Sequence, residues 1–151
     1  MRPRRPLLIA VTGWTGLGLA AAWWPAAAAA WLAVGVVLGG AALADLVLLL
    51  AIRSPLAERR VGHVLPQGVW SDVRLELLNP HRHRVRLDCH DLHPSGFDVQ
   101  GQPRRIVLPP RSRVWVRYRL RSPARGRFAF AGCDLALYSP FGLWRRRRRL
   151  W

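Results

Sequence analysis

Apolar side chains fill the first third of the chain almost without interruption, and this pattern predicts membrane helices. Residues 7–52 contain one charged side chain, Asp45. A helix crosses the hydrocarbon core of a bilayer with about 20 apolar residues, so the stretch is long enough for two crossings. The Trp-Trp-Pro sequence at 23–25 divides it, because proline favours the first turn of a helix and tryptophan the membrane interface. We predict transmembrane helices over residues 7–24 and 26–52.

The rest of the chain alternates apolar and polar residues with a period of two, which predicts β-strands. Val73, Leu75 and Leu77 lie between charged residues, and the same alternation recurs over residues 85–89 and 113–121. Residues 106–108 form a further short apolar run before two prolines. Strands with one apolar face, separated by Pro, Gly and Asn turns, favour an immunoglobulin-like antiparallel β-sandwich.

The end of this pattern changes parity. Phe128 and Phe130 continue the alternation, whereas Leu135 and Leu137 fall on the other face. This shift predicts a β-bulge near Gly132. The full domain prediction is a basic N-terminus (1–6), the two helices, a linker with a first short strand (53–68), a β-sandwich (69–144) and an arginine-rich tail or linker (145–151).

Charge is separated from the apolar stretch. The chain has 24 basic residues, all of them arginine, against 8 acidic ones, giving a formal net charge of +16. An apolar content of 51% excludes a disordered chain, and the separation excludes a simple soluble globule. The strand arginines fall mostly on the polar face, which is typical of a solvated surface. Attraction to anionic lipid is an alternative, and nucleic-acid binding is less favoured because only Trp115 interleaves with them.

Arginines also flank both predicted helices, and none lies in the turn between them. The flanking residues are Arg2, Arg4, Arg5, Arg53, Arg59 and Arg60. Because positively charged flanks stay in the cytoplasm, we expect both ends of the hairpin and the β-domain to be cytoplasmic. The alternative is a signal peptide cleaved near residues 26–30, which would export the β-domain to the periplasm. Asp45 is expected to pack within the hairpin or to be hydrated near its cytoplasmic end.

Chemistry-bearing residues are few. His81, His83, Cys89, His90, Asp91 and His93 are close in sequence. Their spacing matches no tetrahedral metal pattern, and on a strand Cys89 would point inward and His90 outward, so no metal site is predicted. Cys89 and Cys133 should be reduced thiols in the cytoplasm, whereas export would permit a disulfide. No phosphate-binding loop or G-x-S-x-G motif occurs, and we expect no catalytic residue, cofactor or small-molecule substrate.

Several short motifs together resemble a known family. They are a strand ending in Asn (73–79), a strand running into Asp and Pro (87–94), Arg125-Gly126 with Phe128 two residues on, and Ser-Pro-Phe-Gly-Leu-Trp at 139–144. This order is similar to the N-terminal half of bacterial proteins of domain-of-unknown-function family 58. The family's second half, a von Willebrand factor A-like domain, would follow this segment. The matched positions, interpreted structurally, are Arg125, Gly126, Phe128, Ser139, Pro140, Phe141, Gly142 and Leu143, with the two glycines at turns and Phe141 closing the end of the sandwich.

The resemblance implies a role, since members of that family often occur beside MoxR-type AAA+ ATPases. We therefore expect a multi-pass protein of the bacterial inner membrane that serves as an accessory or scaffold and contacts other proteins, an AAA+ ATPase among them. The alternatives are an arginine-rich module that binds anionic lipid or nucleic acid, and an exported periplasmic β-domain.

Overall fold

The computed structural model describes residues 1–62, 64–102 and 104–150, which form two compact units. The first unit contains Met1–Ile52 together with Tyr138–Arg146. The second contains Arg53–Leu137 and the chain after Arg146. The expected order of two long apolar helices followed by antiparallel strands is present, and the strands form a β-sandwich.

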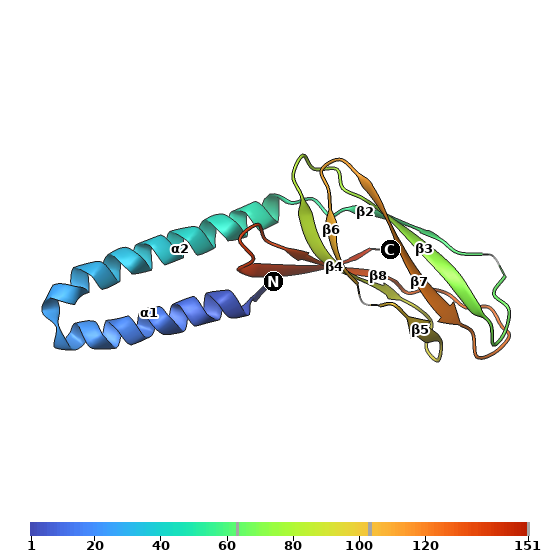
Figure 1. The fold of residues 1–151 in the computed structure, drawn as a ribbon, viewed down its shortest axis with the longest axis horizontal. Coiled ribbons are helices and arrows are strands. Elements are labelled where there is room, and N and C mark those ends of the chain that lie inside the picture. The colour runs from blue at the N-terminus through green and yellow to red at the C-terminus, as the bar shows by residue number, and fades with distance from the viewer. Residues whose placement is uncertain (63, 103, 151) are drawn as a thin grey trace. The chain divides into compact units, whose positions relative to one another are not determined.

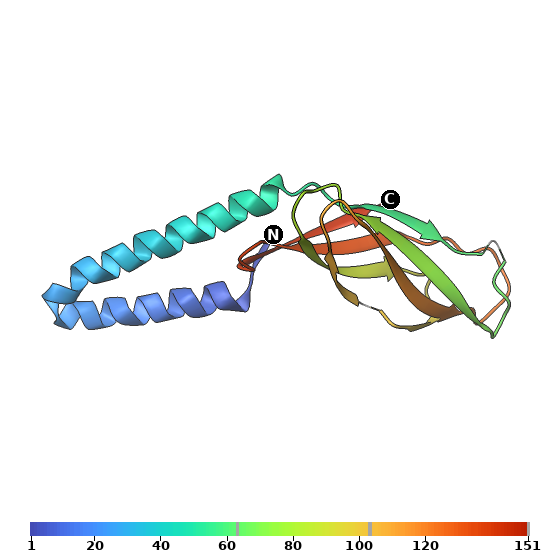
Figure 2. The same ribbon diagram turned by 45° about the horizontal axis from the view of Figure 1, so that its top comes forward.

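The first unit is a helical hairpin, in which the helices run side by side in opposite directions (Figures 1 and 2). Helix α1 spans Arg5–Trp23, and α2 spans Ala28–Ala51 after a short 3-10 turn at Pro25–Ala27. Helix α1 begins at Arg5 instead of residue 7 because Pro6 fits its first turn. A short strand, β1 (Arg2–Pro3), pairs with the first residues of β9.

Two tryptophans hold the helices of this hairpin together. The rings of Trp14 and Trp31 stack with centroids 4.9 Å apart, and each indole N–H donates to the backbone carbonyl of the other residue. Gly18 and Gly35 make room for the rings: a Cβ on either glycine would lie within 2.8 Å of the opposing indole. The close approach of the helices therefore depends on a glycine four residues after each tryptophan.

The second unit consists of two sheets. Its strands, two of which extend into the first unit, are β2 (Leu56–Arg60), β3 (Trp70–Leu78), β4 (Val85–Leu92), β5 (Asp98–Gln100), β6 (Arg104–Leu108), β7 (Arg113–Arg121), β8 (Gly132–Tyr138) and β9 (Trp144–Leu150). One sheet has the order β9-β8-β4-β6 and the other β2-β3-β7-β5. Strand β4 pairs antiparallel with β6 and β8, β3 with β2 and β7, and β7 with β5.

The core of the sandwich follows the alternation in the sequence. Its buried side chains include Val73, Leu75, Leu77, Val85, Leu87, Val116, Leu120, Leu135 and Leu137. Burying such aliphatic side chains contributes roughly 1.5–3 kcal/mol each relative to exposure. Asn79, at the end of β3, is fully buried, and its side chain hydrogen-bonds to the backbone at His81, His83 and Pro109.

Two predictions from the sequence are wrong. The segment predicted as an arginine-rich tail or linker (145–151) is a strand up to Leu150, β9, which lies beside β8 in the sheet, and residue 151 lies outside the described residues.

The β-bulge predicted near Gly132 is also wrong, because β8 pairs with β4 in unbroken register from Gly132 to Leu137. The residues between β7 and β8, which include Phe128 and Phe130, form a loop and not the continuation of a strand. Pro123 and Gly126 lie in this loop, and neither residue favours a continuous ladder. The change of parity at Leu135 therefore comes from this loop connection, with Gly132 as the first residue of β8.

Candidate functional site

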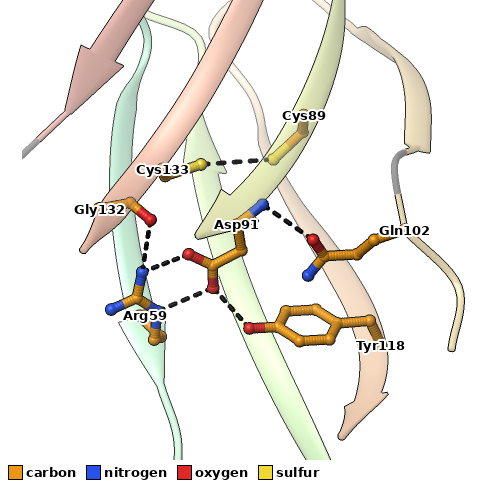
Figure 3. A network of polar contacts seen from close by, with 7 residues as sticks. All are labelled: Arg59, Cys89, Asp91, Gln102, Tyr118, Gly132 and Cys133. Atoms are coloured by element: carbon orange, nitrogen blue, oxygen red, sulfur yellow. Dashed lines mark hydrogen bonds and ion pairs between the residues drawn. The ribbon is translucent and has the colours of Figure 1, made fainter. Parts of the chain in front are cut away.

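A buried carboxylate joins the two sheets of the sandwich (Figure 3). Asp91, on β4, is 1% exposed and accepts hydrogen bonds from two residues of the other sheet. Arg59, on β2, donates to both carboxylate oxygens, with Nε at 2.8 Å from Oδ2. Tyr118, on β7, donates its hydroxyl to Oδ2 at 2.6 Å. The Arg59 guanidinium also donates to the carbonyl of Gly132 at 3.1 Å, so the network contacts three strands around Asp91.

Burial and the carboxylate of Asp91 together determine the protonation states of Tyr118 and Arg59. Burial, the hydrogen bond to Asp91 and the negative charge of Asp91 raise the pKa of Tyr118 well above its usual range. Burial alone would lower the pKa of Arg59, but the hydrogen bond and attraction of Asp91 outweigh it and raise that pKa. Tyr118 is therefore a protonated donor and Arg59 a permanent cation. Arg59 and Tyr118, both on the other sheet, hydrogen-bond to Asp91, and these bonds hold the two sheets of the sandwich together.

Two cysteines lie beside the network. The Sγ atoms of Cys89 and Cys133 are 3.6 Å apart, and both residues are buried as free thiols. The contact with Cys89, and burial after it, raise the pKa of the Cys133 thiol far above its usual range. Cys133 is thus a protonated core residue and a poor nucleophile. Whether the two thiols can be oxidised to a disulfide depends on the compartment in which the β-domain lies. The sequence predicts the cytoplasm, where thiols stay reduced.

An open cleft of about 1430 Å³ lies next to Arg59. It is lined by the segment after β2, by the residue before β5 and by the loop between β7 and β8. These segments bring together Val64, Leu65, Phe97, Arg125, Arg127 and Phe128. No acidic residue lines it among the residues that the structure describes. The cleft therefore combines positive charge with exposed apolar surface, and Phe128 is 44% exposed within it.

A second buried carboxylate lies in the helical unit. Asp45, on α2, is fully buried and accepts hydrogen bonds from the Ser139 hydroxyl at 2.6 Å and from the backbone N–H groups of Phe141 and Leu143 at 2.9 and 3.0 Å. The turn that provides these donors is the Ser-Pro-Phe-Gly-Leu-Trp motif. Its last residue, Trp144, donates its indole N–H to the carbonyl of Ala42 on the same helix.

Arg4, the residue before α1, also contacts this turn. The Arg4 backbone N–H donates to the Leu143 carbonyl, and its guanidinium donates to the Gly142 carbonyl at 3.0 Å and lies over the Tyr138 ring. Gly142 has φ +76°, which glycine adopts without strain, and a Cβ there would lie 3.0 Å from the Arg4 guanidinium. The motif positions 139–143 are thus brought to Asp45, although Phe141 itself is 66% exposed. The expectation that Phe141 closes the sandwich is wrong, because the turn directs its backbone N–H, and not its ring, to a buried partner.

The other motif residues and the flanking arginines lie elsewhere. Arg125 and Gly126 are in the loop that lines the cleft, together with Phe128. Arg5, Arg53 and Arg60 are exposed, whereas Arg59 points into the sandwich with its side chain 12% exposed. Pro140 is exposed in the turn after β8.

The four described histidines lie in two separate pairs. His81 and His83 stack on each other, and His90 and His93 form a second contact. Within the described ranges, no group of three potential ligands is close enough to hold an ion. Cys89 does point inward, as the alternation predicts, and so does Asp91, whose burial sequence reasoning misses. The signal is present, since Asp91 shares its parity with Val85, Leu87 and Cys89.

Comparisons with known proteins give fold likenesses only. No family model matches the chain, and no curated protein matches it. One similar solved structure is the ASH / PapD-like domain of human CEP192 (PapD-like domain 7), with 19% identity, a TM-score of 0.44, and coverage of 62% of this chain and 80% of that one. Another is the FixG-related protein from Vibrio parahaemolyticus, with 9% identity, a TM-score of 0.43, and coverage of 66% and 94%. Likenesses at this level tell nothing about function, and the two-sheet fold follows from the strand pairing itself.

Proposed function

We propose that this chain is a membrane-anchored interaction module, in which the helical hairpin is the anchor and the β-sandwich presents the contact surface. The observation that carries the proposal is the exposure of the helices. Helices α1 and α2 are long and apolar enough to cross a bilayer, and only 6% and 11% of their most apolar windows are buried within the protein. A soluble core helix would be mostly covered, so these side chains fit a lipid environment.

The two ends of the hairpin suit the two faces of a membrane. Trp23 and Trp24, at the turn, are 91% and 75% exposed, as tryptophans at a lipid interface would be. Arginines gather at the other end, where Arg2, Arg4 and Arg5 precede or begin α1. A carboxylate near a membrane is costly when it is unpaired, and the three donors around Asp45 remove that cost. These features favour insertion with the arginine end, and hence the β-sandwich, in the cytoplasm of a bacterial cell.

The experiment is a topology measurement on the full chain. Reporter enzymes that are active only outside the membrane, or only inside it, are fused after Trp24 and after Leu150, and membranes are washed with alkaline carbonate. We expect the chain to stay with the membrane, the fusion after Trp24 to report the outside and the fusion after Leu150 the inside. An outside report from the fusion after Leu150, or release by carbonate, would contradict the proposal.

A partner of the MoxR-type AAA+ class follows from the family resemblance alone and stays a prediction. Co-purification from detergent extracts of the native host, with the chain tagged at its N-terminus, tests it. A second candidate role is binding of anionic lipid or nucleic acid. It is favoured by exposed arginines such as Arg147 and Arg148, whose guanidinium groups form no hydrogen bond or ion pair with any described residue.

A further inference from the structure

The outer face of the β2-β3-β7-β5 sheet contains a row of arginines that the strand register brings together. Arg60 on β2 is directly opposite Arg74 on β3, and Arg74 is directly opposite Arg117 on β7. Like charges at directly opposed positions destabilise a sheet. Arg60 is near Glu76 and lies over the Trp115 ring. The guanidinium groups of Arg74 and Arg117 are exposed and make no ion pair within the described part of the chain.

This row and the cleft form one continuous surface. Arg60, Val61 and Gly62 line the large cleft and also line a second hollow of about 520 Å³ that contains Arg74 and Arg117. At the other side of the cleft, Arg125 and Arg127 are exposed and have no hydrogen-bond partner for their guanidinium groups in the described residues. Hence Arg74, Arg117, Arg125 and Arg127 are all available to an external anion.

The acidic residues near this surface do not neutralise it. Asp72 lines the second hollow, but it is paired with Arg119. Glu76 is paired with Arg60 and Arg113, and Glu58 is paired with Arg60. Carboxylates of the chain itself thus contact Arg60, Arg113 and Arg119 on this face, and an external carboxylate is chemically compatible with the unpaired arginines beside them. A guanidinium suits carboxylates because it offers two parallel N–H donors.

Apolar surface lies within reach of the unpaired arginines. Val64 is 83% exposed and Phe128 44% exposed in the cleft. Phe97 and Phe128 pack edge to face beneath it, with ring centroids 4.9 Å apart, which gives the cleft an aromatic floor. A ligand with both carboxylates and an apolar side chain would therefore satisfy the arginines and cover the floor in one binding event.

We propose that the cleft and the adjoining arginine row bind an extended acidic segment of a partner protein that carries an apolar side chain. The inference rests on the proposed role as an interaction module and states the chemistry of the partner. A flat lipid surface cannot enter a concave cleft to reach its floor. Nucleic acid would need free aromatic faces for bases to stack on. Guanidinium groups already lie over three of the rings near this surface, with Arg60 over Trp115, Arg121 over Trp70 and Arg59 over Phe130. Phe128 alone would offer a base one exposed ring in the cleft, too little for the successive stacking that single-stranded nucleic acid uses.

The test uses the full chain in nanodiscs of neutral phosphatidylcholine. The probe is a fluorescent synthetic peptide in which glutamate alternates with leucine, and binding is followed by anisotropy. We expect the double variant Arg125→Glu, Arg127→Glu to bind the peptide about tenfold more weakly or worse, and Arg74→Glu, Arg117→Glu to bind it several-fold more weakly, with all affinities falling as salt is added. The matched control is Arg84→Glu, Arg86→Glu, which makes the same change of charge at exposed positions at the start of β4, outside both hollows.

The apolar part of the proposal has its own comparison. Phe128→Ala should weaken the glutamate–leucine peptide about three- to tenfold and leave a glutamate–serine peptide unchanged, because only the leucine contacts the floor. Arg125→Gln, Arg127→Gln repeats the main comparison with a milder change, and circular dichroism establishes that each variant is folded.

Several outcomes would overturn the inference. An equal loss in the β4 control would mean that only general charge attracts the peptide. Tighter binding of single-stranded RNA or of phosphatidylglycerol vesicles, lost in the same cleft variants, would assign the surface to nucleic acid or to lipid. Flotation of the nanodiscs reports membrane anchoring separately, so a chain that floats but does not bind the peptide contradicts this inference and leaves the proposed anchor standing.

Discussion

Two buried aspartates, one in each unit, are stabilised in opposite ways. Asp91 lies between β-sheets and is paired with a formal positive charge, the guanidinium of Arg59. Asp45 lies on an apolar helix and is surrounded by neutral donors, one hydroxyl and two backbone N–H groups. A buried ion pair constrains two side chains to each other, so removal of one leaves the other charged and unpaired. A carboxylate held by backbone dipoles instead fixes the path of the main chain that supplies them.

The largest effect should follow from removing the charge of Asp91. Asp91→Asn leaves the guanidinium of Arg59 buried without a counter-charge, so the free energy of unfolding of the β-sandwich should fall by about 3–5 kcal/mol. Urea denaturation of the full chain in detergent, followed by the near-ultraviolet signal, measures it. Asp72→Asn is the matched control, since its pair with Arg119 is exposed and its removal should have almost no effect. Equal stability of these two variants would contradict the bracing role of Asp91.

The same substitution at Asp45 should act locally. Asp45→Asn replaces an acceptor oxygen by an amide donor, which leaves a donor of the turn unsatisfied at a cost of about 1–3 kcal/mol. The turn should open more often, and trypsin should cleave the arginine run of β9 faster while urea denaturation of the sandwich changes little. Ser139→Ala removes only one donor and should show a smaller increase in cleavage. If both variants are cleaved at the rate of the unaltered chain, the hydrogen bonds of Asp45 do not hold the turn.

The helical unit allows a comparison that does not involve charge. Gly35→Ala places a Cβ against the Trp14 ring, and Gly39→Ala places one in open space. Both gain helix propensity of about 1 kcal/mol, but only the first also incurs overpacking of about 1–3 kcal/mol. Thermal unfolding followed by helical circular dichroism in detergent should therefore show the Gly39→Ala variant stabilised and the Gly35→Ala variant not. If both variants gain the same thermal stability, the Trp14 ring does not pack against Gly35.

Alkaline pH offers a further, smaller test of the sandwich. The folded state raises the pKa of Tyr118 and Cys133 above the usual values of 10.0 and 9.0, so it binds more protons than the unfolded state above those values. Stability from these groups is complete below about pH 9 and is lost as pH rises further. Urea midpoints between about pH 8 and pH 11 should fall, and less steeply in Tyr118→Phe. If the urea midpoint falls equally steeply with pH in the unaltered chain and in Tyr118→Phe, the Tyr118 hydroxyl does not contribute to the loss of stability.

Periodicity is sufficient to predict the helices and the sandwich, because burial on one face leaves a regular trace in the sequence. It also predicts the inward position of Cys89, but a polar residue at the same parity, Asp91, looks like the end of a strand. The partners of Asp91 come from other strands, at Arg59 and Tyr118, and no local pattern specifies such a pairing. The loop after β7 escapes prediction because Phe128 and Phe130 keep the spacing of a strand while lining a cleft.

The turn at 139–144 is recognisable as a motif, but the sequence does not show which residue its backbone N–H groups bind. A serine, a proline and a glycine favour a turn, whereas the partner of their backbone N–H groups is nearly a hundred residues earlier. A carboxylate within an apolar helix signals that some partner exists without specifying where.

That separation also sets an order of synthesis. Ser139 comes 94 positions after Asp45, so the helical hairpin is synthesised long before the donors that its carboxylate requires. The hydrogen bonds of Asp45 can therefore form only after β8 and the turn that follows it have been synthesised, so the helical unit is completed by a segment translated after most of the β-sandwich.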